Sequence, residues 1–293
     1  FNCLEFPHAN CSARFGISEY AIDLTQGPIL QSASIASTIY RNYFVKHKKI
    51  PSITNEIKNI DDLCNYFVDI NSNSNVYYNA NDQNEGDKSN IYQGQVDYEL
   101  NLLERTPIPV RHGKAVLDRE QLKLINNEIF QDFDFSNENA YLIGVHQNCT
   151  VSTSRKQDFT LLDTLSQNKI VHQVFASTLS MGGYASKTPK NYEIMRNILF
   201  NMYKLTILAA WENSIMYPDH PGSKKCVLSL LGCGSFSNPV NDVAEAIKSN
   251  KELIQQSGLD VYIVCFDEGF FVKAENILRD VVSETEGTII DAR

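Results

Sequence analysis

The chain has 293 residues, of which 43% are hydrophobic, so it has enough apolar material for one large domain over 1–293. Its formal net charge of -9 at pH 7 argues against a basic surface for nucleic-acid backbones, and we expect no binding to duplex nucleic acid. No stretch approaches the roughly eighteen apolar residues of a membrane helix, and none has the pattern of a signal peptide, so we expect no membrane association. Seven cysteines without a CxxC pair indicate reduced thiols and a cytoplasmic protein.

The first hundred residues contain one predicted helix and one long polar segment. Apolar residues recur at helical spacing shortly after Pro28, which predicts a helix there. The segment 70–95 is crowded with Asn, Asp, Ser and Gly and has no regular period. We therefore predict a surface insertion over 70–95.

The middle of the chain alternates helix and strand patterns. Asp118 with Gln121 matches a capping box and predicts a scaffold helix that carries Leu122, Ile125 and Ile129. The apolar runs 140–145 and 171–179 have the length and β-branched content of strands. Thr188 and Pro189 then predict the start of a long helix. Its predicted buried side comprises Ile194, Met195, Ile198, Leu199, Met202, Leu205 and Ala209.

The last quarter has the pattern of a strand, a helix and a second strand. The strands are predicted over 226–231 and 259–266, and the helix from Pro239 to about residue 256, with Gly258 as its stop. Such a unit implies parallel strands. The alternation along the chain favours a three-layer α/β/α domain with a central mixed sheet.

The loop 232–238, with sequence GCGSFSN, lies between the first of these strands and the helix. Gly232 and Gly234 permit a sharp turn and a close approach to a ligand, and we expect Asn238 to cap the helix. Unpaired amides at the start of a helix favour a phosphate group. The pattern matches neither the dinucleotide fingerprint nor the ATP phosphate loop, because it lacks the third glycine and the lysine.

The segment 230–239, with sequence LLGCGSFSNP, resembles the phosphate loop of macrodomains similar to poly(ADP-ribose) glycohydrolases. The segments 23–28 (DLTQGP) and 40–45 (YRNYFV) resemble a divergent macrodomain-like group that includes a bacterial effector removing ADP-ribose from ubiquitin. The resemblance implies that the partner is ADP-ribose or an ADP-ribosylated protein, ubiquitin among the candidates. It also implies that an effector of this kind would act in the host cytosol.

The resemblance also implies a set of site residues. It places the diphosphate against the loop 232–238, with Phe236 and Asn2 near the distal ribose and Phe266 stacked on adenine. The ligand-binding set is therefore Asn2, Gly232, Cys233, Gly234, Ser235, Phe236, Ser237, Asn238, Phe266 and Asp267. The paired glutamates and glycine-rich catalytic loop of the glycohydrolases have no clear counterpart, and the segment 95–99 (QVDYE) fits them poorly.

Hydrolysis of an ADP-ribosyl bond needs a group that positions water or a ribose hydroxyl at the anomeric carbon. Asp23 is the first candidate, with Gln26 and Asn42 as orienting groups, although Asp23 is equally suited to a turn before Gly27. Two alternatives stay open. One is a domain that binds ADP-ribose without cleaving it, and the other is a hydrolase with Cys233 as nucleophile.

The cysteine alternative needs a base, for which His146 and His172 are the candidates. The six histidines are scattered, and no grouping has the spacing of metal ligands. We therefore predict neither a structural metal nor a cofactor.

Overall fold

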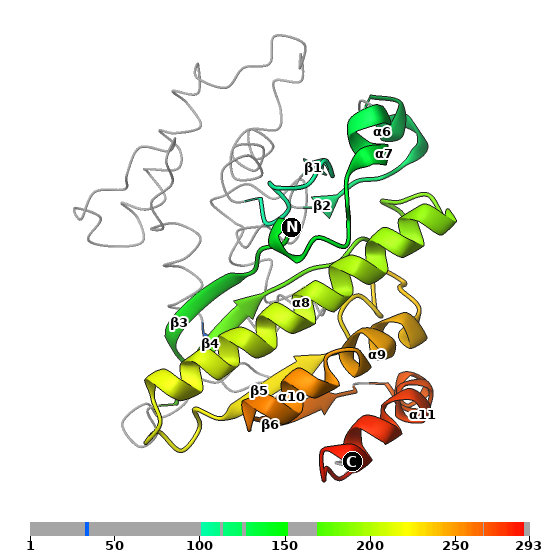
Figure 1. Ribbon diagram of the computed structural model, residues 1–293. Helices are drawn as coiled ribbons and strands as arrows, with labels where there is room; N and C mark the ends of the chain where they lie inside the picture. Colours follow the sequence, from blue (N-terminus) through cyan, green and yellow to red (C-terminus); the bar gives the residue numbers. More distant parts are fainter. Residues whose placement is uncertain are drawn as a thin grey trace, which may run out of the picture. The chain divides into compact units, whose positions relative to one another are not determined.

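The computed structural model describes residues 33–34, 101–111, 114–124, 127–151, 169–265 and 267–289. The described residues are of mixed α/β content (Figure 1). The chain divides into two compact units. One comprises Phe1–Asn101, Val110–Lys114 and Gly144–Phe175, and the other comprises Leu102–Pro109, Ala115–Ile143 and Ala176–Arg293. Nearly all of the helix predicted after Pro28 and the whole of the predicted insertion 70–95 lie outside the described residues.

The first unit contains the antiparallel pair of β3 (Gly144–Thr150) and β4 (Ile170–Phe175), in which Val145 is the partner of Val174. The register shifts between His146 and Cys149, and Asn148 there has a positive φ of 58°. A second, shorter sheet joins β1 (Val110–Arg111) and β2 (Lys114–Ala115). The strand predicted over 171–179 is therefore confirmed in its first part and ends earlier than expected.

The strand predicted over 140–145 is largely wrong. Residues Glu138–Ala140 form a short 3-10 helix, η2, and β3 begins only at Gly144. The reason lies in packing within the second unit. Ala140 and Tyr141 are buried, and the Tyr141 hydroxyl donates a hydrogen bond of 2.6 Å to the Phe135 carbonyl.

The helix predicted after Asp118 begins where expected, as α6 (Arg119–Leu124), and a second helix, α7 (Asn127–Asp132), follows. Ile129, which the predicted helix carries, lies in α7 and is 59% exposed. Phe130 is buried in its place, with its ring centroid 5.2 Å from that of Phe135. The aromatic contact thus selects the adjacent position for the core.

The longest element of the second unit is α8 (Pro189–Met216). The Thr188 side chain accepts a hydrogen bond from the Asn191 amide and Pro189 occupies the first turn, which confirms the predicted start. Five of the seven predicted core residues are fully buried, while Leu205 and Ala209 are half-buried. The buried ones are Ile194, Met195, Ile198, Leu199 and Met202.

The predicted strand-helix-strand unit is confirmed in outline. The strands β5 (Lys225–Ser229) and β6 (Asp260–Val264) are parallel, and Gly258 ends the preceding helix with a φ of 61°. The helical part is divided into α9 (Val240–Lys248) and α10 (Lys251–Ser257). The break falls at Asn250, whose buried side chain donates to the Ala246 and Phe200 carbonyls.

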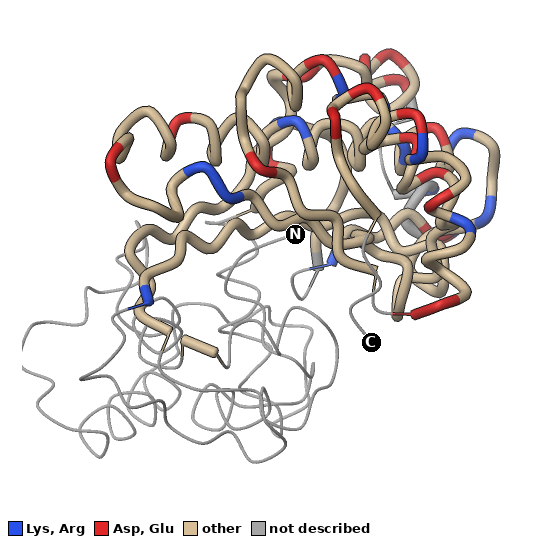
Figure 2. The backbone as a smooth tube through the Cα atoms, turned by 90° about the horizontal axis from the view of Figure 1, so that it is seen from below, with Lys and Arg blue, Asp and Glu red and all other residues tan. Residues whose placement is uncertain are grey.

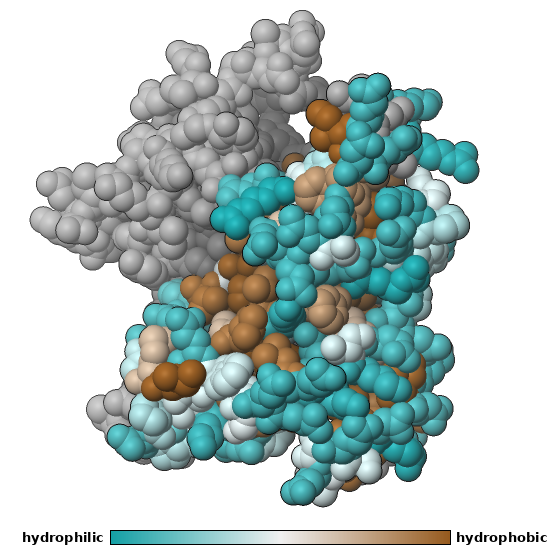
Figure 3. Space-filling view, in the orientation of Figure 1, coloured by the Kyte–Doolittle hydropathy of each residue, from teal (hydrophilic) through white to brown (hydrophobic). Residues whose placement is uncertain are grey.

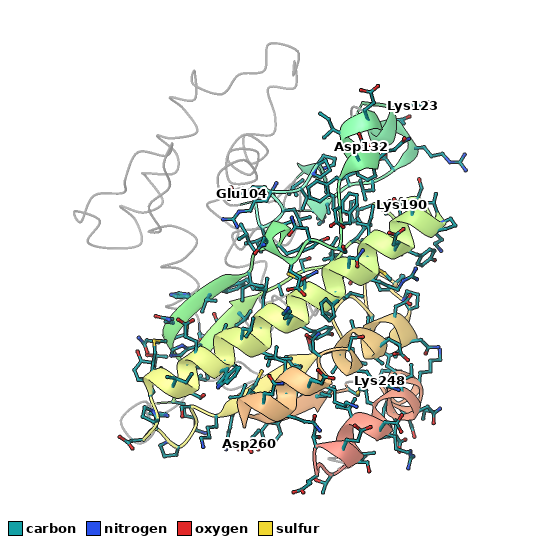
Figure 4. All side chains as sticks on the ribbon, in the orientation of Figure 1. Glu104, Lys123, Asp132, Lys190, Lys248 and Asp260 are labelled. Carbon is teal, nitrogen blue, oxygen red and sulfur yellow. The ribbon has the colours of Figure 1, made fainter. Side chains whose placement is uncertain are left out.

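The last helix, α11 (Glu268–Glu284), buries Ala274, Leu278 and Val281. It packs on α9, which also contacts α8. Lys248, labelled in Figure 4, reaches from α9 to Asp280 of α11 at 3.3 Å. Among the described residues, no helix combines the length and the apolar character that crossing a bilayer requires.

Candidate functional site

The loop 230–239 follows β5 and leads into α9, and its first turn depends on Gly232. This residue has a φ of 81°, in the left-handed region that glycine adopts without strain. A Cβ at this position would lie 2.5 Å from Thr178 Cγ2 and 2.6 Å from Asn238 Nδ2. Both the backbone conformation and the space therefore require glycine at 232.

The backbone of the loop is held by three internal hydrogen bonds. The Cys233 amide donates to the Leu230 carbonyl (3.2 Å), the Ser237 amide to the Gly234 carbonyl (2.9 Å) and the Asn238 amide to the Gly232 carbonyl (3.0 Å). Between these bonds, the amides of Gly234, Ser235 and Phe236 have no acceptor among the described residues. Gly234 and Ser235 are exposed, and Phe236 is half-buried. Three consecutive amides in the loop ahead of α9 therefore have no acceptor in the described part of the chain.

The entry of the loop is fixed by Tyr203, a residue of α8. Its buried hydroxyl donates to the Ser229 carbonyl at 2.6 Å and accepts from the Leu231 amide at 2.9 Å. The same oxygen thus holds the last residue of β5 and the beginning of the loop. Burial raises the pKa of Tyr203 well above its usual range, so the hydroxyl keeps the proton that it donates.

The exit of the loop is fixed by Asn238, whose side chain is only 4% exposed. Its Oδ1 accepts from the Met181 amide at 3.2 Å, and its Nδ2 donates to Thr178 Oγ1 at 3.4 Å. The predicted helix cap is therefore wrong, because Pro239 occupies the capping position of α9 and makes no side-chain cap bond. Asn238 instead joins the loop to a segment sixty residues away.

That segment, 178–183, forms a second loop that sequence reasoning missed. A Cβ on Gly182 would lie 3.0 Å from Ser237 Oγ and 3.3 Å from the carbonyl oxygens of Ser235 and Phe236. The close approach of the two loops therefore depends on a small residue at 182. The available signal was the pair Gly182 and Gly183 just beyond the strand predicted over 171–179, at a carboxyl end where ligands commonly bind.

Cys233 lies within the loop but its side chain is buried, with 6% exposed. Burial, with a smaller contribution from Cys265, raises the pKa of the Cys233 thiol to about 11. A nucleophilic cysteine needs the opposite shift, because the thiolate is the reactive form. The two proposed bases, His146 and His172, belong to β3 and β4 of the other unit. The buried thiol and its raised pKa do not favour the cysteine-hydrolase alternative.

The remaining predicted site residues are distributed as follows. Asn2, Asp23, Gln26, Asn42 and Phe266 lie outside the described residues. Asp267 is exposed, and its Oδ1 accepts a hydrogen bond of 3.1 Å from the Phe270 amide at the start of α11. Its carboxylate therefore acts as a helix cap.

No protein-family model, curated protein or solved structure matches this chain. The described part of the chain contains no cluster of three or more His, Cys, Asp or Glu side chains that could hold a metal ion. The functional groups that the site offers are the amides of the loop 232–238 and the positive end of α9.

Proposed function

We propose that this chain binds ADP-ribose, with the diphosphate held by the loop 232–238 of a three-layer, macrodomain-like domain. The observation that carries the proposal is the run of amides at Gly234, Ser235 and Phe236, which have no acceptor among the described residues. Successive amides of a glycine-containing loop that leads into a helix are a common way of binding phosphate oxygens, because the loop donors and the helix dipole act together. Net charge does not oppose such a site, since the donors are local.

The surroundings of the loop support an anionic ligand in two further ways. A Cβ on Gly234 would meet no atom within 4 Å, so there is open space beside the donors. The carboxylate of Asp242, in the first turn of α9, would repel a phosphate if no basic side chain lay beside it. This carboxylate lies 3.6 Å from the Arg196 guanidinium, which offsets that charge.

The rest of the ligand is assigned by resemblance. Phe236 and Asn2 would lie near the distal ribose, and Phe266 would stack on adenine. Hydrolysis of an ADP-ribosyl linkage is the activity proposed for the whole chain, with Asp23 as the catalytic carboxylate and Gln26 and Asn42 as orienting groups. The substrate would be an ADP-ribosylated protein such as ubiquitin, in the cytosol of the producing cell or of a host.

Calorimetric titration of the full chain with ADP-ribose tests the binding proposal. Gly234→Glu should abolish the heat of binding, because it puts a carboxylate beside the proposed phosphate position. Gly234→Ala is the matched control, and we expect it to keep a folded protein with measurable affinity. Well-folded wild-type protein that gives no heat with ADP-ribose would remove the proposal.

Hydrolysis is tested separately, by release of ADP-ribose from ADP-ribosylated ubiquitin. We expect Asp23→Ala to stop the release while leaving the affinity for free ADP-ribose nearly unchanged. Equal turnover by this variant would move the catalytic role to another residue. Binding without any release by the wild-type protein would identify a reader of ADP-ribose.

A further inference from the structure

Two buried side chains, those of Tyr203 and Asn238, fix the two ends of the loop 232–238. Neither residue is one of the three, 234–236, whose amides have no acceptor among the described residues. Tyr203 reaches the entry from α8 and bonds both Ser229 and Leu231. Asn238 holds the exit through Met181 and Thr178 of the second loop. The amides of Gly234, Ser235 and Phe236 therefore lie between two ends of the loop that are each fixed by side-chain hydrogen bonds.

We propose that Tyr203 is a positioning residue for ADP-ribose, which it never touches, because its hydroxyl fixes the loop in the conformation that presents the three amides. The inference rests on the proposed function of the same loop. Tyr203 is 3% exposed, so contact with a ligand is not its role. It acts by determining where Leu231 and the following residues lie.

The physical reason is preorganisation. A loop that is already ordered loses little conformational entropy when the ligand binds, and this gain appears directly as affinity. The Tyr203 hydroxyl bonds both the Leu231 amide and the Ser229 carbonyl, which a phenyl ring could not do. Removing only the hydroxyl leaves the Ser229 carbonyl and the Leu231 amide without this partner, so the entry of the loop gains alternative conformations.

The decisive variant is Tyr203→Phe, and the chain offers a matched control in Tyr141→Phe. Tyr141 is equally buried, at 3%, and its hydroxyl also donates to a backbone carbonyl at 2.6 Å, that of Phe135. Both variants lose one buried hydroxyl in the same unit. Only Tyr203 bonds the loop, so the pair separates a loss of loop geometry from a general loss of stability.

We expect Tyr203→Phe to weaken ADP-ribose binding by about tenfold and Tyr141→Phe by less than about twofold, in calorimetry on the full chain. Thr178→Val, which removes the acceptor of Asn238 Nδ2 at the exit, should give an intermediate loss. The inference is overturned if Tyr203→Phe binds within about twofold of wild type, or if Tyr141→Phe loses as much as Tyr203→Phe.

Amide hydrogen exchange of the segment 230–238 provides a readout that needs no ligand. We expect faster exchange in Tyr203→Phe than in wild type, and no change in Tyr141→Phe. Unchanged exchange in Tyr203→Phe would reject the positioning role. If wild-type protein gives no heat with ADP-ribose, the proposed function fails, and the exchange measurement still decides whether Tyr203 fixes the loop.

Discussion

Two glycines of the same loop differ in what the backbone requires of them. Gly232 has a φ of 81° and is surrounded by Thr178 and Asn238, whereas Gly234 has open space around its Cα. We predict that Gly232→Ala lowers the free energy of unfolding by more than about 2 kcal/mol, from left-handed strain and steric overlap. Gly234→Ala should change it by less than about 1 kcal/mol. Urea denaturation of both variants measures these changes. Similar losses of unfolding free energy in the two variants would contradict the different backbone requirements of Gly232 and Gly234.

Cys233 leads to a prediction about reactivity and pH. Its pKa is raised from 9.0 to about 11, so the folded state keeps the thiol proton at pH values where the unfolded chain would lose it. The resulting stabilisation is fully present below pH 9 and disappears as the pH rises through 11. At roughly pH 8 the thiolate fraction, and with it the alkylation rate, should be about a hundredfold below that of an ordinary thiol.

Mass spectrometry of the peptide containing Cys233, after timed treatment with iodoacetamide, measures this rate. Urea-unfolded protein is the control, because its Cys233 should react at the ordinary rate. Rapid modification of the folded protein near neutral pH would revive the cysteine-hydrolase alternative. Full release of ADP-ribose from ADP-ribosylated ubiquitin by Cys233→Ser would argue independently against a catalytic thiol.

Asn238 shows why single-residue roles are hard to predict from local sequence. An asparagine before a proline and an amphipathic helix has the pattern of a cap, and that was the natural expectation. The structure uses the side chain for two bonds to residues 178 and 181 instead. No local pattern could reveal partners so far away in the sequence, although Gly182 and Gly183 do mark the second loop itself.

The helix α8 combines a buried core with an exposed apolar end, and the two should respond differently to substitution. Ile198 is fully buried, whereas Ile215 is 67% exposed. Figure 3 shows apolar surface along the C-terminal half of this helix, where Leu208, Ile215 and Met216 are exposed. Ile198→Ala should cost about 2–5 kcal/mol in the free energy of unfolding, and Ile215→Ala less than about 0.5 kcal/mol.

Chemical denaturation of the two alanine variants tests this contrast within a single helix. Both substitutions remove the same side-chain atoms from the same helix. Their difference therefore measures burial. A small loss in Ile198→Ala would mean that the core of the second unit is less tightly packed than the structure indicates.

The elements that were predicted well are those whose determinants are local. The start of α8 and the strand-helix-strand order from β5 to β6 follow from capping residues, glycine and apolar periodicity. The errors occur where tertiary contacts decide. Asn250 bonds a carbonyl of α8 and divides a predicted single helix, and packing of Ala140 and Tyr141 delays the start of β3.

At the scale of the whole molecule, charge separates two kinds of phosphate ligand. Figure 2 shows acidic and basic positions interspersed over the described helices. The full chain carries a net charge of -9 at pH 7. Binding to duplex nucleic acid draws its affinity from several Lys and Arg side chains that release counterions together. A single diphosphate needs only a few aligned amides. An acidic protein can therefore bind a diphosphate and still repel a nucleic-acid duplex.

We therefore predict that the full chain does not bind a duplex at physiological ionic strength. Fluorescence anisotropy of a labelled DNA duplex should not rise on addition of protein at about 150 mM salt, and should rise little at roughly 50 mM. The heat of ADP-ribose binding should change much less over the same salt range, because the amide donors carry no net charge. Duplex binding that weakens steeply with salt would contradict this and would require a basic surface formed by residues beyond the described part of the chain.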